Sequence, residues 1–381
     1  MDFRPSEEQE LLRRTIRELA ETSMAPYVAE WDRDQHFPAE LVPALAQLGL
    51  MGMQLPDRYG GAELSTIDYC ICIEELARVD PSVALSVAAH NGLCTAHIFR
   101  FGSDAQKERY LGPLARGEHV GAWALTESES GSDAAALRTT ATRSGDQWVL
   151  NGSKAFTTHG SVGHVLVAMA VTDRSRGHHG ISAFIIERGT PGLTAGRKED
   201  KLGMRACDTS EVVLDGCRVP DAQRLGEEGE GFVNALEVLD AGRVGIAALA
   251  VGLAQGAYEA ARDYARERRQ FGKALQEFQA TQWKLADLAT RIEAARLLTY
   301  RAGFLKDHSR PMTRESATAK LYASETAVRA AEECVQIHGG YGFVKGYPAE
   351  KFFRDVKLTT IGEGTSEIQR IVIARQLLGM P

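Results

Sequence analysis

One unbroken helical pattern, from Phe232 to Arg268, constrains the fold more than any other feature of the 381-residue sequence. At 1.5 Å per residue, such a helix is roughly 55 Å long. It is apolar on more than one face, so several neighbouring helices are needed to cover it. Three more helical segments follow, at 276–307, 313–338 and 364–378. Together they predict a four-helix bundle, within this chain or shared with another subunit.

The first third of the chain is also predicted to be helical. Ser6 and Gln9 have the spacing of a capping box, and apolar residues recur at helical spacing after them. Asp80, followed by proline, predicts the cap of another helix over residues 82–101, whose alanine-rich face indicates burial. We therefore expect an N-terminal helical domain over residues 1–119.

Residues 120–230 have a different pattern, in which short β-rich runs alternate with turn signals. The expected strands are 148–150, 165–171, 181–186 and 211–214, and the expected turns are Asn151-Gly152, Arg176-Gly177 and Asp215-Gly216. No helix-length segment separates the strands, which favours an antiparallel sheet or barrel over a parallel crossover sheet. The fold class is therefore α+β and mainly α, with a small β domain in the middle and the helical bundle at residues 231–381.

Composition argues against several classes of function. The formal net charge is -7 and no basic cluster is present, which disfavours binding to nucleic acid or to an anionic membrane surface. No apolar run approaches the roughly 20 residues of a membrane-spanning helix, and the N-terminus has no export signal. The six cysteines have neither disulfide nor zinc-ligand spacing. We expect no metal site and a reducing compartment, with the cytoplasm as the default.

Well-known nucleotide and catalytic motifs are absent from the sequence. No Gly-x-Gly-x-x-Gly joins a strand to a helix, and there is no Walker loop, His-Glu-x-x-His or Gly-x-Ser-x-Gly. Any redox chemistry therefore needs a cofactor that is held in another way.

Three widely separated segments carry a more specific signal. Residues 123–133 form a small-residue loop whose amides and hydroxyls suit a phosphate or a polar ring edge, although a polar connector explains them equally well. Residues 151–158 have the pattern of an Asn-Gly hairpin followed by a strand. In residues 361–370, Glu363 lies between two glycines, ahead of Thr365, a candidate helix cap near which anions are favoured. Taken alone, such a glutamate is usually a solvated loop residue.

In this order and on this scaffold, the three segments resemble the acyl-CoA dehydrogenase family across nearly the whole chain. The resemblance implies that the chain binds FAD and that Glu363 is the general base that removes the α-proton of an acyl thioester. One branch of the family places the base just before the arginine of the long helix. That position is Gly242 here, so Glu363 is the only matching candidate.

The same resemblance implies which residues contact the flavin. Family members usually have proline at position 128 and tryptophan at position 156, where this chain has Ser128 and Phe156. Contacts to the isoalloxazine and pyrophosphate are implied for Trp123, Leu125, Thr126, Gly131, Ser132, Phe156, Thr157 and Thr158. Contacts to the flavin of a neighbouring subunit are implied for Arg268, Gln270, Phe271 and Gln279. The adenosine end would be covered by Gln336, Gly339, Gly340, Thr365 and Glu367. Taken alone, the arginine-rich end of the long helix merely complements the helix dipole.

Substrate contacts, partners and assembly also follow from the resemblance. Acyl-CoA contacts are implied for Ser132, Asp240, Arg243 and Gly364. The alternative for Asp240 and Arg243 is a buried ion pair within the helix. Sites shared between subunits imply at least a dimer, and the family is commonly tetrameric, as a dimer of dimers. The implied reaction yields a trans-2-enoyl-CoA and passes electrons to an electron-transfer flavoprotein.

The acyl group and the electron acceptor leave alternatives open. Residues 239–246 are most similar to short-chain members, whereas Gly362 stands where many straight-chain members have tyrosine. Residues 86–93 contribute no arginine, which disfavours a dicarboxylic substrate. We therefore expect a short or short-branched acyl-CoA. An acyl-CoA oxidase using dioxygen is a rival, although oxidases usually carry an extra C-terminal domain. The second rival is a non-catalytic homologue that acts as a binding or assembly partner.

Overall fold

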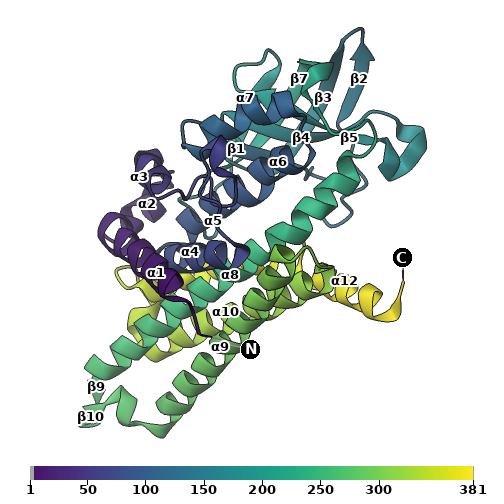
Figure 1. The fold of residues 1–381 in the computed structure, drawn as a ribbon. Helices are drawn as coiled ribbons and strands as arrows, with labels where there is room; N and C mark the ends of the chain where they lie inside the picture. Colours follow the sequence, from purple (N-terminus) through teal and green to yellow (C-terminus); the bar gives the residue numbers. More distant parts are fainter. Residues whose placement is uncertain (1–3, 381) are drawn as a thin grey trace.

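Three long helices form the spine of the computed structural model, which describes residues 4–380 (Figure 1). They are α8 (Gly231–Glu267), α9 (Gln279–Asp307) and α10 (Thr313–His338). Each begins and ends within three residues of the range predicted from the sequence, and α10 packs against both of the others. Most buried residues of α8 are alanine or glycine, and alanine is the commonest buried residue of α10, which lets the helix axes approach closely.

The N-terminal helices pack on one side of this spine, where α4 lies along α8. The Ser6–Gln9 capping box is present, with Gln9 N donating to Ser6 Oγ at 3.1 Å. The helix predicted over 82–101 is two α-helices joined by a π-helical turn, a feature that often marks functional sites. The elements are α1 (Glu7–Leu19), η1 (Ala20–Met24), α2 (Val28–Asp34), η2 (Ala39–Leu41), α3 (Val42–Gln47), η3 (Asp57–Tyr59), α4 (Thr66–Val79), α5 (Pro81–Ala89), η4 (His90–Thr95), α6 (Ala96–Phe101) and α7 (Asp104–Ala115).

The middle of the chain folds into one eight-stranded sheet, in the order β6-β7-β3-β2-β4-β5-β8, with β1 paired to β4. Its strands are β1 (Gly121–Ala124), β2 (Thr140–Ser144), β3 (Gln147–Thr158), β4 (Val165–Val171), β5 (Ile181–Glu187), β6 (Leu193–Lys198), β7 (Thr209–Pro220) and β8 (Arg224–Leu225). The sheet is mixed rather than purely antiparallel, because β4 runs parallel to β1 and β2. A parallel pair needs a long connection, and here the β2–β3 hairpin supplies it in place of a helix.

Two of the predicted turns are wrong. Asn151-Gly152 lies inside β3 and Asp215-Gly216 inside β7, where the pairing of the two strands shifts register. The Gly216 amide donates to Asn151 Oδ1 at 2.8 Å, so these turn-forming residues build a bulge that bends two long strands. The Arg176-Gly177 turn is confirmed, within the 3-10 segment η5 (Arg174–Gly180) between β4 and β5.

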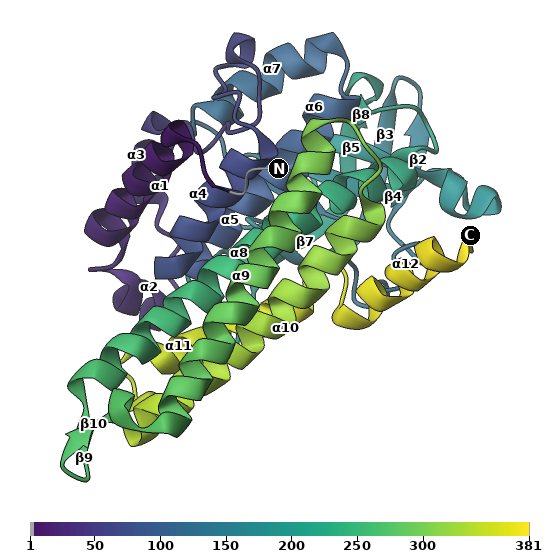
Figure 2. The same cartoon turned by 60° about the horizontal axis from the view of Figure 1, so that its bottom comes forward.

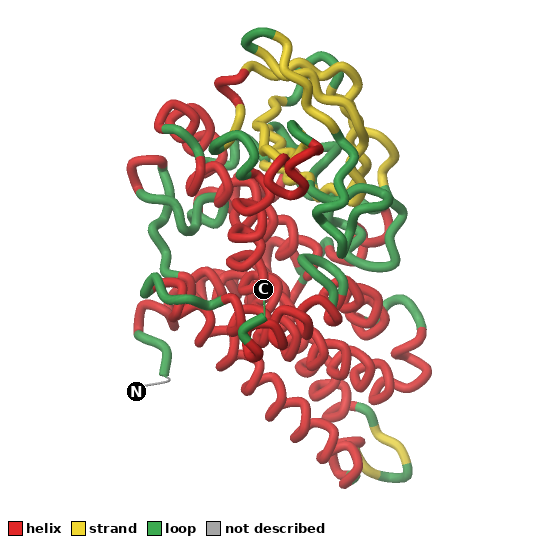
Figure 3. Tube along the Cα trace, turned by 90° about the vertical axis from the view of Figure 1, so that its right-hand side faces the viewer, coloured by secondary structure: helices red, strands yellow, loops and turns green. Residues whose placement is uncertain are grey.

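The remaining elements connect these or follow them, and the last of them, α12, packs beside α10 (Figure 2). They are η6 (Asp221–Gln223), β9 (Arg269–Gln270), β10 (Lys273–Ala274), η7 (Leu275–Glu277), η8 (Gly339–Phe343), α11 (Pro348–Asp355), η9 (Val356–Thr360) and α12 (Ser366–Leu378). The β9–β10 hairpin and the large sheet lie at opposite ends of the molecule (Figures 1 and 3). No helix within residues 4–380 is long and apolar enough to cross a membrane.

A buried charge network joins the three parts of the chain. Lys351 of α11 donates to Asp80 Oδ1 at 2.8 Å and to Asp355 Oδ2 at 2.6 Å. Asp80 caps α5 through the Ser82 amide, and Asp355 accepts from the Met204 amide at 2.6 Å. Because Met204 lies between β6 and β7, the network fixes the β domain, the N-terminal helices and the C-terminal helices in one arrangement.

Candidate active site

Glu363 lies in a sharp turn between η9 and α12. Its φ is 53° and that of Gly364 is 92°, so two successive residues adopt the left-handed conformation, which costs a non-glycine residue roughly 1–2 kcal/mol. Thr365 then caps α12, with its Oγ1 accepting from the Ile368 amide at 3.3 Å. The turn directs the carboxylate inward, where Oε2 is buried and has no hydrogen-bond partner in the described chain. Strain and an unpaired buried oxygen together indicate a functional position.

Gly242 of α8 provides the space for this carboxylate. A Cβ atom built on Gly242 would lie 2.3 Å from Glu363 Oε2 and 3.3 Å from Leu93 Cδ2. The side chain of Leu93 packs with Trp123 of β1 in one apolar cluster. The Glu363 carboxylate is therefore set between α8, η4 and the edge of the β domain.

The charges around Glu363 suit a base that works near neutral pH. Burial raises the pKa of its carboxyl to about 7, although the positive charges of Lys320 and Arg243 act to lower it. Burial likewise lowers the pKa of Lys320 to about 8, against the opposing influence of Glu363. A carboxylate with a pKa near 7 can accept a proton and release it again at physiological pH.

Asp240 and Arg243, one turn apart on α8, form the ion pair that the sequence suggested as an alternative. Arg243 Nη1 lies 2.5 Å from Asp240 Oδ1, and Thr313 Oγ1 donates to Asp240 Oδ2 at 2.6 Å. Arg243 is buried and its Nε has no partner among the described residues. The pair therefore leaves one donor of Arg243 available beside the turn that carries Glu363.

A second buried pair holds the loop that follows β1. Lys154 of β3 donates to Glu127 Oε1 at 2.7 Å and to the Leu125 carbonyl at 3.2 Å. Glu127 also accepts from the backbone amides of Arg138 and Thr139, at 2.7 and 3.1 Å. Burial lowers the pKa of Lys154 to about 8 despite this carboxylate. The loop is therefore fixed at both of its ends against β3, with Thr126 accepting from the Ala155 amide at 2.9 Å.

The surface next to this loop fits a planar, polar ring. Phe156 is 65% exposed and has a φ of 53°, so its ring stands outside the sheet. Ser132 is exposed, and a Cβ atom built on Gly131 would find no atom of the described chain within 4 Å. An exposed aromatic face beside open polar backbone suits the isoalloxazine of FAD.

Two of the residues expected to contact the flavin expose little of their polar groups. Thr157 is 2% exposed, and its Oγ1 is buried without a hydrogen-bond partner in the described chain. Trp123 donates its indole N–H to His97 Nδ1 at 3.0 Å. Only its ring is therefore left for a contact.

The chain does not bring together all the residues predicted for the cofactor. Arg268 packs over the ring of Tyr341 at 5.5 Å, and Phe271 is 94% exposed. Both lie at the hairpin end of the bundle, opposite Phe156 and the β domain (Figures 1 and 3). Five other residues predicted to contact the cofactor lie at this same end and are exposed, namely Gln270, Gln279, Gln336, Gly339 and Gly340.

Thr365 and Glu367 lie apart from that group, although both were predicted to help cover the adenosine end. They begin α12, whose preceding residue Gly364 accepts a hydrogen bond from Lys320. Gln336 is 16 residues further along α10, which is roughly 24 Å for a helix. One chain therefore places these two parts of the predicted site well apart.

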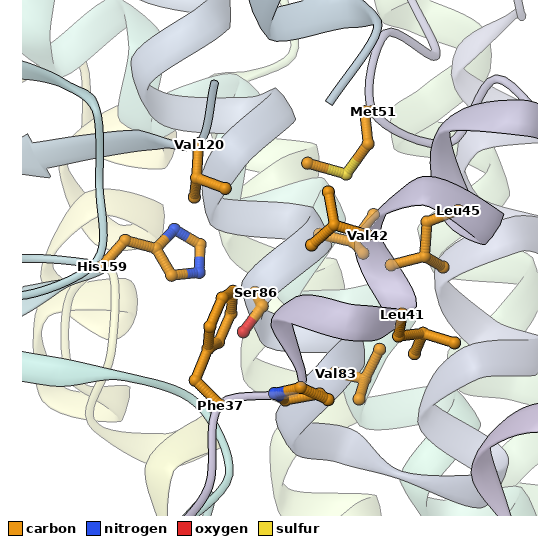
Figure 4. Close-up of a pocket in the computed structure, with 11 residues that line it drawn as sticks. Phe37, Leu41, Val42, Leu45, Met51, Val83, Ser86, Val120 and His159 are labelled. Carbon is orange, nitrogen blue, oxygen red and sulfur yellow. The ribbon is translucent and has the colours of Figure 1, made fainter. Parts of the chain in front are cut away.

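A small cavity, shown in Figure 4, lies between α5 and the end of β3. Its volume is about 20 Å³, and it is lined by Phe37, Ser86 and His159 among others. His159 Nδ1 bonds the Gly121 carbonyl, whereas Nε2 is buried without a partner in the described chain. The cavity has room for about one water molecule, so it is too small for an acyl chain.

Four residues that shape the site were not identified from the sequence, namely Glu127, Lys154, Lys320 and Gln369. The sequence does contain a signal for Lys320. The buried residues of α10 recur at three- and four-residue spacing, and this lysine is one of them. They are Ser316, Lys320, Ala323, Ala327, Ala330, Cys334 and Ile337. A lysine in a stripe of small apolar residues needs a buried partner.

Comparison with known proteins identifies the family of the chain. The chain matches the acyl-CoA dehydrogenase N-terminal domain over residues 6–118, the middle domain over 122–217 and the C-terminal domain over 229–378. The short-chain specific acyl-CoA dehydrogenase of Clostridium acetobutylicum is 45% identical over 377 residues, which are 99% of this chain and 100% of that protein.

Solved structures are similar over the whole length. Butyryl-CoA dehydrogenase from Megasphaera elsdenii superimposes with a TM-score of 0.97 at 43% identity, covering 99% of this chain and 100% of that one. A chain from the structure described as the electron transferring flavoprotein of Acidaminococcus fermentans has a TM-score of 0.98 at 45% identity, with the same coverage. This chain therefore belongs to the acyl-CoA dehydrogenases, a family of FAD-dependent oxidoreductases.

Proposed function

We propose that the protein dehydrogenates a short or short-branched acyl-CoA between its α- and β-carbons, with Glu363 as the base that removes the α-proton. The observation that carries the proposal is the Glu363 carboxylate itself: Oε2 is buried, lacks a partner among residues 4–380 and faces Gly242. The short-chain relative and the butyryl-CoA dehydrogenase structure support the choice of substrate.

The turn that carries Glu363 also offers a hydrogen-bond donor for the thioester. The α-proton is weakly acidic, so catalysis must stabilise the carbonyl oxygen as negative charge develops on it. The Glu363 amide donates to no acceptor in the described chain, so its N–H is free to bind the thioester oxygen. One residue therefore supplies both the base and a donor to the enolate oxygen.

The substrate loses two hydrogens, one as a proton and one as a hydride. The α-proton passes to Glu363 Oε2, and the β-hydrogen leaves as a hydride, which gives trans-2-enoyl-CoA. FAD supplies the hydride acceptor in this family. Burial of Glu363 against Leu93 and Gly242 keeps water from the carboxylate, and so preserves the raised pKa on which proton abstraction depends.

We further propose that each flavin site is completed by a second copy of the chain, in a homotetramer arranged as a dimer of dimers. Arg268, Gln270 and Phe271 lie at the end of α8 and in the β9–β10 hairpin, which is at the opposite end of the molecule from the β domain that contains Phe156 (Figure 1). An exposed aromatic ring and a guanidinium at this end suit the flavin pyrophosphate of a partner. Electrons would then pass to an electron-transfer flavoprotein.

The test is an anaerobic titration of the yellow protein with a panel of acyl-CoAs while the flavin absorbance is followed. Bleaching by butyryl-CoA or a short branched acyl-CoA supports the proposal, and Glu363→Gln should keep FAD but show no bleaching. Full-speed bleaching of Glu363→Gln would refute the base assignment. Stoichiometric peroxide release in air would favour the oxidase alternative instead.

A further inference from the structure

Lys320 is a fully buried lysine in the alanine-rich face of α10, with an exposed fraction of 0%. Its ammonium donates to the carbonyl oxygen of Gly364 at 2.7 Å, and it forms no ion pair within residues 4–380. An ammonium in the interior is costly to keep charged unless it is paired and hydrogen-bonded. Within the described residues, its one hydrogen-bond partner is Gly364, the residue that follows Glu363.

Gln369 holds the same turn from the other side. It is also 0% exposed, and its Nε2 donates to the Gly364 carbonyl at 2.8 Å and to the Glu363 carbonyl at 3.3 Å. Gln369 belongs to α12, which packs beside α10 (Figure 2). Two helices therefore fix the carbonyl oxygens of Glu363 and Gly364.

We propose that Lys320 is a positioning residue for proton abstraction, which clamps the Gly364 carbonyl, together with Gln369, and so keeps the Glu363 carboxylate against Gly242. The inference rests on the proposed role of Glu363 as the base. Clamping is needed because Glu363 has a glycine on each side and a left-handed backbone. Such a segment otherwise relaxes to other conformations.

The charge of Lys320 has a second effect on the same carboxylate. The groups that face Glu363 are Lys320 from α10, Arg243 from α8 and the Tyr69 hydroxyl from α4. Arg243 is already paired with Asp240, whereas Lys320 has only a neutral carbonyl as its partner. Glu367 of α12 acts on Lys320 through its negative charge. Lys320 therefore favours the ionised form of Glu363, and its loss raises the pKa of that carboxyl.

The experiment compares four variants of the FAD-loaded protein by anaerobic stopped-flow bleaching across about pH 6 to 9, with the acyl-CoA that reduces the wild type. We expect Lys320→Met to slow the limiting rate of flavin reduction about 100-fold. In the pH profile of that rate, the midpoint of the acid limb should move up by about one pH unit. Lys320→Arg keeps the charge and should keep the midpoint. Gln369→Leu loses the hydrogen bonds to the Glu363 and Gly364 carbonyls but no charge. Its rate of flavin reduction should therefore fall, while the midpoint of its pH profile stays that of the wild type.

The matched control is Lys306→Met. Burial lowers the pKa of Lys306 to about 8 as well, and its ammonium donates to Gln54 Oε1 at 2.8 Å rather than to the Glu363 turn. This variant also loses a desolvated ammonium, and its midpoint should remain that of the wild type. A shift as large as that of Lys320→Met would make the effect unspecific and overturn the proposal.

The remaining outcomes separate this inference from the function on which it rests. Wild-type rate and midpoint in Lys320→Met, with no bleaching of Glu363→Gln, overturn the role of Lys320 and leave the base in place. Full bleaching of Glu363→Gln overturns both. If Lys320→Met loses FAD or its native circular dichroism, Lys320→Gln replaces it, since it keeps a donor without the charge. An unchanged midpoint there contradicts the proposal.

Discussion

Gly242 and Glu363, 121 positions apart in the sequence, meet so closely that a Cβ atom on the glycine would lie 2.3 Å from the carboxylate oxygen Oε2. If Glu363 is the base, as proposed, the contact accounts for glycine at position 242, which the family resemblance marks as the alternative position for that base. The two positions share one space, so only one of them can carry the side chain.

Gly242→Ala should therefore displace the Glu363 carboxylate and slow flavin reduction about 100-fold, because a shift near 1 Å has that effect on a reacting group. FAD content should not change. The measurement is single-turnover bleaching with the preferred acyl-CoA. Gly112→Ala in α7 is the control, since its Cβ would meet only the flexible end of Arg116. Equal rates for the two variants would contradict the packing described.

The pH dependence of reduction should follow Glu363. The base must be ionised, and burial raises its pKa to about 7, so the rate should rise roughly tenfold per pH unit below 7 and level off above it. A stopped-flow series at constant ionic strength measures this. A plateau that already extends down to about pH 5 would show that the carboxyl has its ordinary pKa.

Glu363→Gln should make the folded protein more stable at alkaline pH. The folded pKa of this acid is raised, so in the wild type its destabilising effect appears as pH rises from about 4.5 to 7. The variant should gain up to about 3 kcal/mol at pH 8 and little at pH 4. Urea unfolding at both values tests this, with exposed Glu332→Gln of α10 as the control. Equal gains at the two pH values would argue against ionisation as the cause.

Lys154→Met should weaken both the fold and FAD binding. It leaves the Glu127 carboxylate buried without its counter-ion, which costs about 3–5 kcal/mol. Replacing both residues, as Lys154→Met with Glu127→Leu, should recover part of the unfolding free energy but not the ordered loop that begins at Leu125. Urea unfolding and the FAD dissociation constant separate the two effects. Full recovery of FAD binding in the double variant would show that the pair does not organise the cofactor loop.

Mixed oligomers test whether flavin sites are shared. Glu363→Gln lacks the base, and Arg268→Ala lacks the proposed contact to a partner's flavin. In a mixed pair, the site with an intact Glu363 receives an intact Arg268 from the other subunit. Co-expression with two purification tags should therefore restore activity that neither variant has alone. If the mixture is as inactive as its components, Arg268 serves the flavin of its own chain or none.

Periodicity predicted the long helices closely because each of them buries a regular stripe, as Ala323, Ala327 and Ala330 do on α10. Turn chemistry was less reliable in the sheet. Asn151 and Gly216 bond each other across two strands and form a bulge, and no local signal distinguishes that from a hairpin. The parallel pairing of β1 with β4 was also hidden, because it depends on where the β2–β3 hairpin folds back.

The site could be predicted only as far as its residues are contiguous in the sequence. The Glu363 segment and the two flavin segments were recognisable as strings of residues. Lys320 and Gln369 were not, because their roles depend on three-dimensional contacts with the Gly364 carbonyl. The separation of Arg268 from Phe156 likewise appears only once the length of the bundle is known.

Helix α8 carries Gly242 in its first half and leads directly into Arg268 at its C-terminal end. The 26 positions that separate them correspond to roughly 39 Å of helix. If the proposed assembly is correct, this rod acts as a ruler: the helical rise alone sets how far one protomer's base lies from the neighbour's cofactor. The length of α8 is then constrained by two reaction centres at once, in addition to the buried stripe that holds the helix in its own subunit.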